Sequence, residues 1–436
     1  MADASYSTGA RRRDLDLLRV LLVFGLVFFH TGRIFDTVEL PEGVKNLPPS
    51  IAATVFGGFF ALWGMPLMFA IAGFAIWHSL RKRKGKAFLV DRLQRLVVPF
   101  IFGVMALVPV QVYFHLKQAE PAASIAYLQF LPKFFAVRLC PDLLNAFICP
   151  DPATGLFTTA HLWFLKDLFI FSALLLPLFL YLQGQKGGVV LERLADFLAR
   201  PGMIWLLALP VAGFEAFLVT ATMGGSWNEY TYAVLLVFGF LIAASPPLAQ
   251  AIGRSWRSAL VIALVVEVAY IVGLYILMEV YDVNPLHDYD WRSLLWRAVK
   301  SLGAFAWIVA ILGFGSRPRS KPAPEAPQKL SGAGEPLPSS GFGARLIAYL
   351  SEAFLPFYIL HQTVIFVIGF YVVQWDMPAL LKFLLISFSS LAVTLLLYEF
   401  AVRRTKLSRW LFGMRMSLHT PAAGVSPGTG AGEVAL

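Results

Sequence analysis

Long apolar segments, repeated along almost the whole chain, constrain its fold more than any other feature. Ten of these segments are long enough to cross the hydrocarbon core of a bilayer as an α-helix. They cover residues 15–35, 52–78, 96–115, 161–183, 203–223, 231–251, 258–280, 294–314, 346–373 and 379–402. Hydrophobic residues make up 58% of the 436 residues and charged residues only 14%, too few charges for the surface of a soluble protein. The sequence therefore predicts an all-α integral membrane protein, a polytopic bundle of about ten transmembrane helices.

The distribution of Lys and Arg between the loops predicts how the chain is oriented. Loops on the side of the N-terminus hold most of these residues, including the run from Arg81 to Lys84. The opposite loops hold only Arg33, Lys45, Lys117, Lys133, Arg138 and Arg292. Because basic residues are enriched in cytoplasmic loops, both termini are expected in the cytoplasm. The net charge of +10 has the same origin, so nucleic acid is not expected as a partner.

One membrane domain is predicted, and a single long linker interrupts it. Its first eight helices span residues 15–315, its last two helices span residues 346–402, and residues 116–160 form a long outer loop. The other segments are a basic cytoplasmic N-terminus, a Pro-, Ser- and Gly-rich cytoplasmic linker and a cytoplasmic tail, at residues 1–14, 316–345 and 403–436.

The outer loop contains both cysteines of the chain, Cys140 and Cys149. In an oxidising compartment they would form a local disulfide; otherwise they would be two free thiols at the membrane surface. The sequence leaves both alternatives open.

Two ionisable residues, Arg19 and His30, stand within the first span. Their separation of eleven positions corresponds to about three helical turns, so both side chains lie on one face, about 16 Å apart along the axis. Ionisable groups inside a membrane helix are costly and are functional candidates by default. Glu215 and Glu267 also lie within predicted spans, but no role is assigned to them.

A second group of polar residues falls at different depths of the predicted bundle. Arg92 and Arg95 stand at the cytoplasmic mouth of the third span, on the same side as Arg19. His161 opens the fourth span toward the outer side, and His361 lies near the middle of the ninth. Guanidinium groups bind phosphate through a fork of donors, and neutral imidazoles suit proton transfer near neutral pH. These depths favour a donor that bears phosphates and reaches outward from the cytoplasm, such as a coenzyme A ester.

Each of these residues also has a purely structural interpretation. Arg92 and Arg95 would mark the cytoplasmic interface of the third span. His161 would sit at the outer interface beside Trp163, and His361 would form a hydrogen bond to a neighbouring helix.

Four motifs, in one order along the chain, resemble the membrane acyltransferase-3 family over residues 10–415. They are Arg19 followed by ten residues and His30, Arg92-Leu-Gln-Arg95 after the segment Ile71-Ala-Gly73-Phe, His161-Leu-Trp163-Phe-Leu, and Pro356-Phe-Tyr358-Ile-Leu-His361-Gln362-Thr363. The last two resemble the branch of the family that contains glucan biosynthesis protein C.

The resemblance implies a ten-helix enzyme that lies among the lipids of the bacterial inner membrane and moves an acyl group, often acetyl or succinyl. The donor is expected to be cytoplasmic acyl-CoA. The acceptor is expected to be a hydroxyl of an envelope or periplasmic glycan on the outer side. No metal is expected.

The resemblance also implies roles for individual residues. Arg19 and His30 match the family's essential pair, and Arg92 and Arg95 match its two-arginine motif. We interpret His30 as the general base on the acceptor hydroxyl. Arg19 would steady the donor or neutralise the developing oxyanion, and the other two arginines would bind the phosphates of coenzyme A.

The remaining candidates surround that base. His361, with His161 and Tyr358, would line the acceptor side or hold His30 in one tautomer. Trp163 is a further substrate-binding candidate. An acyl-histidine intermediate is an alternative to direct attack by the acceptor.

Two other classes of protein are compatible with buried charges. A transporter or flippase for an acylated glycan or lipid also needs them along its path, although we find no internal repeat of the kind many transporters show. A metal-dependent membrane protein would use His30, His161 and His361 as ligands.

Overall fold

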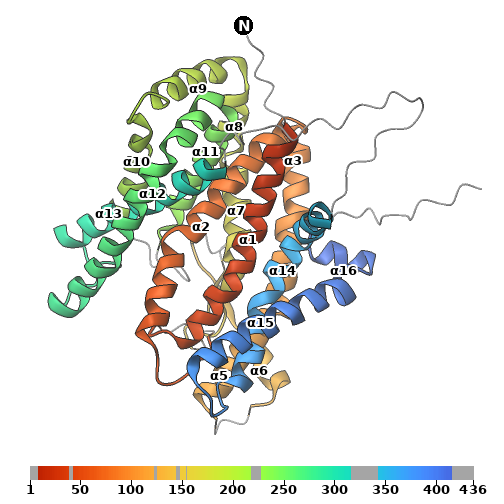
Figure 1. Ribbon diagram of the computed structural model, residues 1–436. Coiled ribbons are helices and arrows are strands. Elements are labelled where there is room, and N and C mark those ends of the chain that lie inside the picture. The colour runs from red at the N-terminus through yellow and green to blue at the C-terminus, as the bar shows by residue number, and fades with distance from the viewer. Residues whose placement is uncertain are drawn as a thin grey trace, which may run out of the picture.

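A computed structural model describes residues 8–38, 43–121, 125–143, 148–153, 155–217, 227–315 and 342–414 of the chain. Regular structure in these residues is almost entirely helical, as predicted (Figure 1). Before the long loop the chain forms α1 (Thr8–Phe35), α2 (Ile51–Leu80), α3 (Gly85–Arg92), the π-helical turn η1 (Leu93–Val97), α4 (Val98–Ala106) and α5 (Val108–Ala119).

After the long loop, the chain is again helical up to residue 411 within the described ranges. The first elements are η2 (Ala160–Leu162), α7 (Trp163–Leu174), α8 (Leu176–Gln183), α9 (Gln185–Leu198), η3 (Met203–Leu207), α10 (Ala208–Phe217) and α11 (Glu229–Ala244). They are followed by α12 (Pro246–Tyr275), η4 (Ile276–Val280), α13 (Trp291–Gly315), α14 (Phe342–Val372), α15 (Ala379–Leu397), η5 (Tyr398–Val402) and α16 (Lys406–Leu411).

Within the described ranges, seven helices are long and apolar enough to cross a membrane. They are Leu17–Phe35, Ile51–Leu80, Gly85–Ala119, Pro246–Val280, Trp291–Gly315, Arg345–Val372 and Ala379–Val402. An eighth candidate is the bent pair formed by Ala160–Leu174 and Leu176–Gln183. Two shorter apolar helices, Met203–Phe217 and Glu229–Ala244, occupy the places predicted for the fifth and sixth spans. The protein is thus a multi-pass all-α membrane protein, while the count of ten and the cytoplasmic termini stay predictions.

The fourth predicted span is bent rather than straight. Its two parts, α7 and α8, meet at an angle of 52°. Pro177 lies in the first turn of α8 and has no N–H to donate to the preceding turn, where its ring also clashes with the backbone. The proline explains the bend.

The boundary between the sixth and seventh predicted spans is placed wrongly by the sequence. A loop was expected between residues 251 and 258, because Arg254 and Arg257 interrupt the apolar pattern there, but α12 runs through both. The break comes earlier, where the Ser245 side chain caps the N-terminus of α12 by accepting from the Leu248 N–H. Pro246 then begins the new helix.

The terminal and linker segments predicted from composition are only partly described. Residues 8–14 form the start of α1, and residues 342–345 form the start of α14. The rest of the predicted linker, residues 316–341, and the tail after residue 414 lie outside the described residues.

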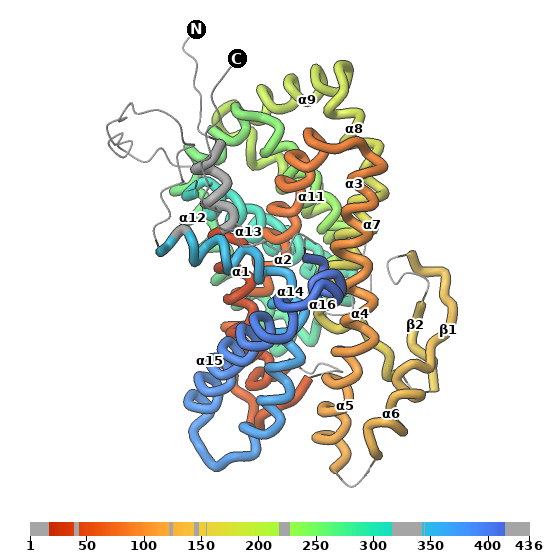
Figure 2. The backbone as a smooth tube through the Cα atoms, turned by 90° about the vertical axis from the view of Figure 1, so that its right-hand side faces the viewer, coloured from red at the N-terminus to blue at the C-terminus, as the bar shows by residue number. Residues whose placement is uncertain are grey.

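The predicted outer loop folds into α6 (Tyr127–Phe134) and an antiparallel hairpin of β1 (Val137–Leu139) and β2 (Ile148–Pro150). A disulfide joins Cys140, directly after β1, to Cys149 within β2, with Cα atoms 5.9 Å apart. Of the two alternatives for the cysteines, the structure has the disulfide. Figure 2 shows α6 near the end of the molecule opposite to α9, and the hairpin on the flank beside α4.

Two groups of helices pack tightly in the part of the bundle that contains the candidate residues. In one, α1 packs against α14 and α15: Phe24 stacks on Phe357 with ring centroids 4.5 Å apart, and Phe28 lies 6.4 Å from Phe383.

In the other group, α2 and α11 approach so closely that glycine is required. A Cβ added to Gly73 would lie 1.9 Å from the carbonyl oxygen of Leu236, and one added to Gly239 would lie 1.7 Å from that of Ala70. Small residues let membrane helices pack backbone against backbone. Gly73, which stands in one of the motifs, thus fixes α2 against α11.

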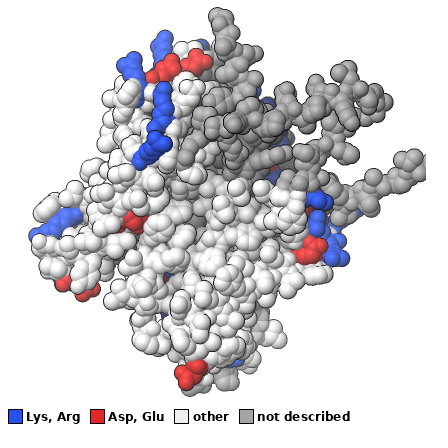
Figure 3. Space-filling model, viewed as in Figure 1, with Lys and Arg blue, Asp and Glu red and all other residues white. Residues whose placement is uncertain are grey.

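The surface divides into charged ends and an apolar girdle. On the face shown in Figure 3, Lys and Arg gather near α9, near α16 and at the left edge of the view, and most of the area between is uncharged. For example, the helix α12 exposes Val261, Leu264, Val265 and Val268. Apolar side chains exposed in this way on a membrane protein face the lipid.

Candidate active site

Three histidines from distant parts of the chain meet inside the bundle. His30 comes from α1, His161 from η2 and His361 from α14. The ring centroid of His361 lies 5.1 Å from that of His30 and 5.1 Å from that of His161. His161 and His361 are buried, and His30 is half-buried. The structure thus brings together the three imidazoles that were candidates from the sequence.

The backbone of α14 fixes the tautomers of two of these rings. Nδ1 of His361 lies 2.7 Å from the carbonyl oxygen of Tyr358, and Nε2 of His161 lies 3.2 Å from that of Ile359. A carbonyl oxygen only accepts, so each of these nitrogens donates a proton. In the neutral ring, Nε2 of His361 and Nδ1 of His161 therefore keep a free electron pair. Both atoms are buried and have no hydrogen-bond partner among the described residues.

His30 is the third ring, and its Nδ1 is likewise buried without a hydrogen bond to any described residue. Phe29 packs beside it, with ring centroids 5.0 Å apart. A half-buried imidazole next to two rings with free electron pairs is suited to accept and pass on a proton.

Local backbone geometry positions His161. The residue before it, Ala160, has φ +43°, a left-handed conformation that is uncommon for a residue with a Cβ. Thr158 supports this turn, because its hydroxyl accepts from the Ala160 N–H at 3.0 Å. The hydroxyl of Tyr358 donates to the carbonyl oxygen of His161 and so ties the turn to α14. Strain of this kind is typical of functional sites.

Trp163, predicted to bind substrate, lies within an aromatic cluster. Its ring centroid is 6.2 Å from that of Phe69 and 5.2 Å from that of Tyr232. Phe69 and Tyr232 stack on each other at 4.5 Å. Trp163 therefore packs α7 against α2 and α11.

The three predicted arginines lie near one another. The charge of Arg92 interacts with those of Arg19 and Arg95, and with that of Asp91. Asp91 forms ion pairs with Arg95, at 3.1 Å, and with Arg83, at 2.6 Å. A basic cluster from α1, α3 and η1 results.

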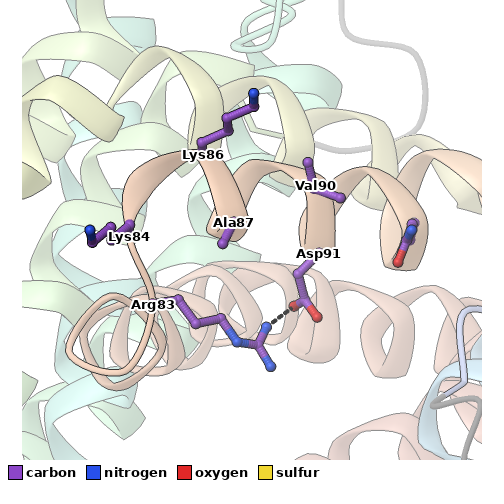
Figure 4. A pocket seen from close by; sticks show the side chains of 7 residues that line it. Arg83, Lys84, Lys86, Ala87, Val90 and Asp91 are labelled. Carbon is purple, nitrogen blue, oxygen red and sulfur yellow. Dashed lines mark ion pairs between the residues drawn. The ribbon is translucent and has the colours of Figure 1, made fainter.

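A pocket of about 650 Å³ opens beside this cluster. It is lined by Arg83, Lys84, Lys86, Ala87, Val90, Asp91 and Gln94. Figure 4 shows Arg83 reaching toward Asp91, whereas Lys84 and Lys86 extend away from that pair. A basic pocket with flexible lysines and a guanidinium suits a ligand with several phosphates.

Comparison with known proteins decides the family. A family model of acyltransferase-3, described as an acyltransferase domain, matches residues 12–399. The chain belongs to the acyltransferase-3 family. No match is found among curated proteins or among solved structures. The acyltransferase-3 match covers α1 through the first residues of η5, so it includes the three histidines and the basic cluster.

Membership of the acyltransferase-3 family makes the protein a membrane acyltransferase. The narrower branch with glucan biosynthesis protein C stays a prediction. The match also places the basic pocket inside the acyltransferase domain, whereas from the sequence Arg83, Lys84 and Lys86 were assigned to the orientation signal only. Their position at and just before the start of α3, the helix that leads directly to the Arg92 motif, is the signal that would have revealed the pocket.

The structure also bears on the metal-site alternative. The described residues of this acyltransferase-3 domain contain no group of three or more His, Cys, Asp or Glu side chains placed to hold a metal ion. The arrangement of the three histidines therefore gives no support to the metal-site alternative.

Proposed function

We propose that this acyltransferase moves an acetyl or succinyl group from cytoplasmic acyl-CoA to a hydroxyl of an envelope or periplasmic glycan, with His30 as general base. The observation on which the proposal depends is the meeting of His30, His161 and His361, with two of the tautomers fixed by α14. Membership of the acyltransferase-3 family supports acyl transfer in general.

In the proposed reaction the acceptor hydroxyl attacks the thioester carbonyl of the donor. His30 takes the hydroxyl proton as the new C–O bond forms, and the C–S bond then breaks. The proton passes to the departing sulfur, so coenzyme A leaves as a thiol. The neutral rings of His361 and His161 lie around the His30 ring and keep it in one orientation. General-base help of this kind contributes about 10²- to 10⁴-fold in rate.

The donor is proposed to approach from the basic cluster. Arg19 lies on the face of α1 that bears His30, about 16 Å away along the helix axis. Arg92 and Arg95, with the pocket beside them, would bind the nucleotide phosphates of coenzyme A. The pantetheine arm would then extend along α1 toward the histidines.

The topology we propose has ten spans in the bacterial inner membrane and both termini in the cytoplasm. The disulfide between Cys140 and Cys149 supports an outer position for their loop, because disulfides persist in oxidising compartments. The α6 part of the loop also lies near the end opposite to α9, which contains the basic residues Lys186 and Arg193 (Figure 2). The His161 and His361 motifs favour a succinyl group and a periplasmic glucan, as in the branch that contains glucan biosynthesis protein C.

His30→Ala tests the proposal. Membranes with this variant should lose acyl transfer while the protein still accumulates, and His287→Ala, an exposed histidine outside the site, should behave like the natural protein. Mass spectrometry of envelope glycans from a deletion strain, and from that strain with each variant restored, identifies the acyl group and the acceptor. Full activity of His30→Ala would reject the general base.

A further inference from the structure

An aromatic cluster borders the histidines on the side of α2. Phe59, Phe60 and Trp63 of α2 form it together with Trp307 of α13, and we call these four residues the aromatic platform. Trp63 lies 5.4 Å from Phe60 and 5.8 Å from Trp307, measured between ring centroids, and Phe59 lies 5.6 Å from Trp307.

The platform is joined to the proposed base by a single ring. Phe29 lies 5.0 Å from the ring of His30 and 6.3 Å from that of Phe60. Gly64, one helical turn after Phe60, faces open space: a Cβ added to it would meet no described atom within 4 Å beyond its own stretch of helix. A ligand on the platform would therefore have one end near His30.

A buried carboxyl group is attached to the platform. Glu267 of α12 is 6% exposed, and its Oε2 accepts from the Trp307 indole N–H at 2.9 Å. Its Oε1 is buried and has no hydrogen-bond partner in the described part of the chain, and the same is true of the indole N–H of Trp63. The site therefore offers one strong acceptor and one donor whose partners are not protein groups described here.

Glu215, the other glutamate within a predicted span, shows what a structural carboxyl looks like in this protein. Its Oε1 accepts from the Asn228 backbone N–H and from the Thr231 hydroxyl, both at 2.7 Å. Its Oε2 is 2.7 Å from the Lys300 ammonium. Burial of a carboxyl is costly unless its oxygens accept hydrogen bonds. The buried Oε1 of Glu267, which accepts none from the described residues, therefore points to a ligand.

The chemistry of the site selects among ligands. The face of an aromatic ring is electron-rich and packs against polarised C–H groups, which line the face of a pyranose ring. Sugar hydroxyls both donate, as Oε1 of Glu267 requires, and accept, as the Trp63 N–H requires. An acyl chain would cover the rings but leave Oε1 without a donor.

We infer that the aromatic platform and Glu267 bind a sugar ring of the acceptor and hold one of its hydroxyls toward His30. The inference rests on the proposed function, and it assigns to Trp63, Trp307 and Glu267 a role in binding the carbohydrate. Glu267, which had no role assigned from the sequence, becomes the polar group that orients the sugar.

The test compares Michaelis constants for the two substrates in protein purified into lipid nanodiscs. The probes are acyl-CoA and the glycan fraction extracted from the envelope of the natural host. Glu267→Gln keeps an oxygen for the Trp307 N–H but turns an NH₂ group toward the ligand, and Trp63→Phe keeps the ring but loses the N–H. Each should raise the KM for glycan about tenfold or more and leave the KM for acyl-CoA within about twofold.

Matched controls change residues of the same types at exposed positions. Glu279→Gln alters an exposed glutamate in η4, directly after α12, and Trp291→Phe alters an exposed tryptophan in α13. Both should keep both KM values. An unchanged glycan KM in Glu267→Gln and Trp63→Phe, an equal rise in both KM values, or a rise for acyl-CoA alone would overturn the inference. If Trp63→Phe fails to accumulate, Glu267→Gln decides.

Direct binding separates this inference from the proposed function. The same glycans are titrated into nanodiscs without acyl-CoA, with the natural protein and Glu267→Gln. If the natural protein binds glycan more tightly than Glu267→Gln but transfers no acyl group, the proposed function fails and the sugar site stands. If the natural protein transfers acyl groups and Glu267→Gln binds glycan equally well, the sugar site fails and the proposed function stands.

Discussion

Two adjacent carbonyl groups of α14 determine which nitrogens of the site are basic. The carbonyl oxygens of Tyr358 and Ile359 accept from His361 and His161, respectively. Each ring is thereby held with its other nitrogen, buried and without a described partner, toward the interior of the site. A proton taken up by His30 thus lies beside two neutral rings, each with one nitrogen able to accept it in turn.

The first prediction concerns His361. In His361→Asn the amide N–H₂ still donates to the Tyr358 carbonyl, but the basic Nε2 is lost. We expect kcat to fall by about 10²- to 10⁴-fold while the affinity for acyl-CoA changes by no more than about twofold. Initial rates and acyl-CoA titrations of purified protein measure both quantities.

His115 offers a matched control for this variant. Its Nδ1 lies 2.8 Å from the Gly43 carbonyl oxygen, the same kind of bond as in His361, but its ring is not one of the three that meet in the site. His115→Asn should retain the natural kcat. Retention of the natural kcat by His361→Asn as well would show that Nε2 has no part in catalysis.

The helix that supplies the basic cluster is not a regular α-helix. Between α3 and α4 the five residues of η1 form a π-helical turn, which contains one extra residue and rotates the next helix, α4, by about 100° about the axis. Arg92 ends α3 and Arg95 lies inside the turn. The guanidinium of Arg92 covers the ring of Phe88 at 5.1 Å, and Arg95 is tied to Asp91. The turn thus separates two neighbouring arginines into different environments within one cluster.

The second prediction concerns this turn. Arg92→Ala combined with Arg95→Ala should weaken acyl-CoA binding about a hundredfold or more, because each of the two lost charged hydrogen bonds is worth about 1.5–3 kcal/mol and every 1.4 kcal/mol is about tenfold. The affinity for glycan should not change. Titration of the purified protein with acyl-CoA gives the affinity.

The control pair has the same spacing on another helix. Arg254→Ala with Arg257→Ala removes two arginines three positions apart in α12, on the side predicted to be cytoplasmic. It should leave acyl-CoA affinity intact. Equal losses in both double variants would assign the effect to net charge, and no loss in the first would remove Arg92 and Arg95 from the donor site.

Hydropathy predicted the places of the long helices well, because a lipid-facing or buried helix must be apolar over its full length. It failed where local backbone chemistry decides the geometry. Pro177 bends the fourth span, and the Ser245 cap with Pro246 starts α12 before the arginines that were expected to separate two spans. The arginines tolerated inside α12 keep their charged ends in water while their stems lie along apolar surface.

Less of the candidate site than of the helices could be predicted from the sequence. Spacing within one helix related Arg19 to His30, since helical geometry is known in advance. The meeting of His161 with His361 depends on the φ of Ala160 and on the Tyr358 hydroxyl, and neither can be read from residue order. Glu267 stands in no recognised motif. Only the structure shows that its Oε1 lacks a described hydrogen-bond partner while its Oε2 accepts from Trp307.

The number of spans depends on two short helices. The 16 residues of α11 cover about 24 Å at about 1.5 Å per residue, less than the hydrocarbon core of about 30 Å. Glu215 of α10 joins α11 and α13 through Thr231 and Lys300, so this polar junction lies at the shared end of the two short helices. Either both helices cross a locally thinned bilayer, or they enter and return as a pair.

The third prediction distinguishes these topologies. Single cysteines are introduced by Lys186→Cys before α10, Tyr230→Cys in the first turn of α11 and Gln250→Cys at the start of α12, all at exposed positions. With ten spans, a membrane-impermeant maleimide should label Tyr230→Cys in intact cells, and the other two only after the cells are opened. The natural protein, whose cysteines form a disulfide, is the unlabelled control.

If Tyr230→Cys is instead protected in intact cells like its two neighbours, α10 and α11 form a re-entrant pair, and the protein has fewer than ten spans. The orientation of α12 to α15 would be the same in either case, because an inserted or removed pair of crossings leaves the later helices facing the same way. His361 and Glu267 would therefore keep their depth, and the proposed route from the basic cluster to the histidines would be unaffected. If Lys186→Cys were labelled in intact cells, both termini would be misplaced, and the donor could not reach Arg92 from the cytoplasm.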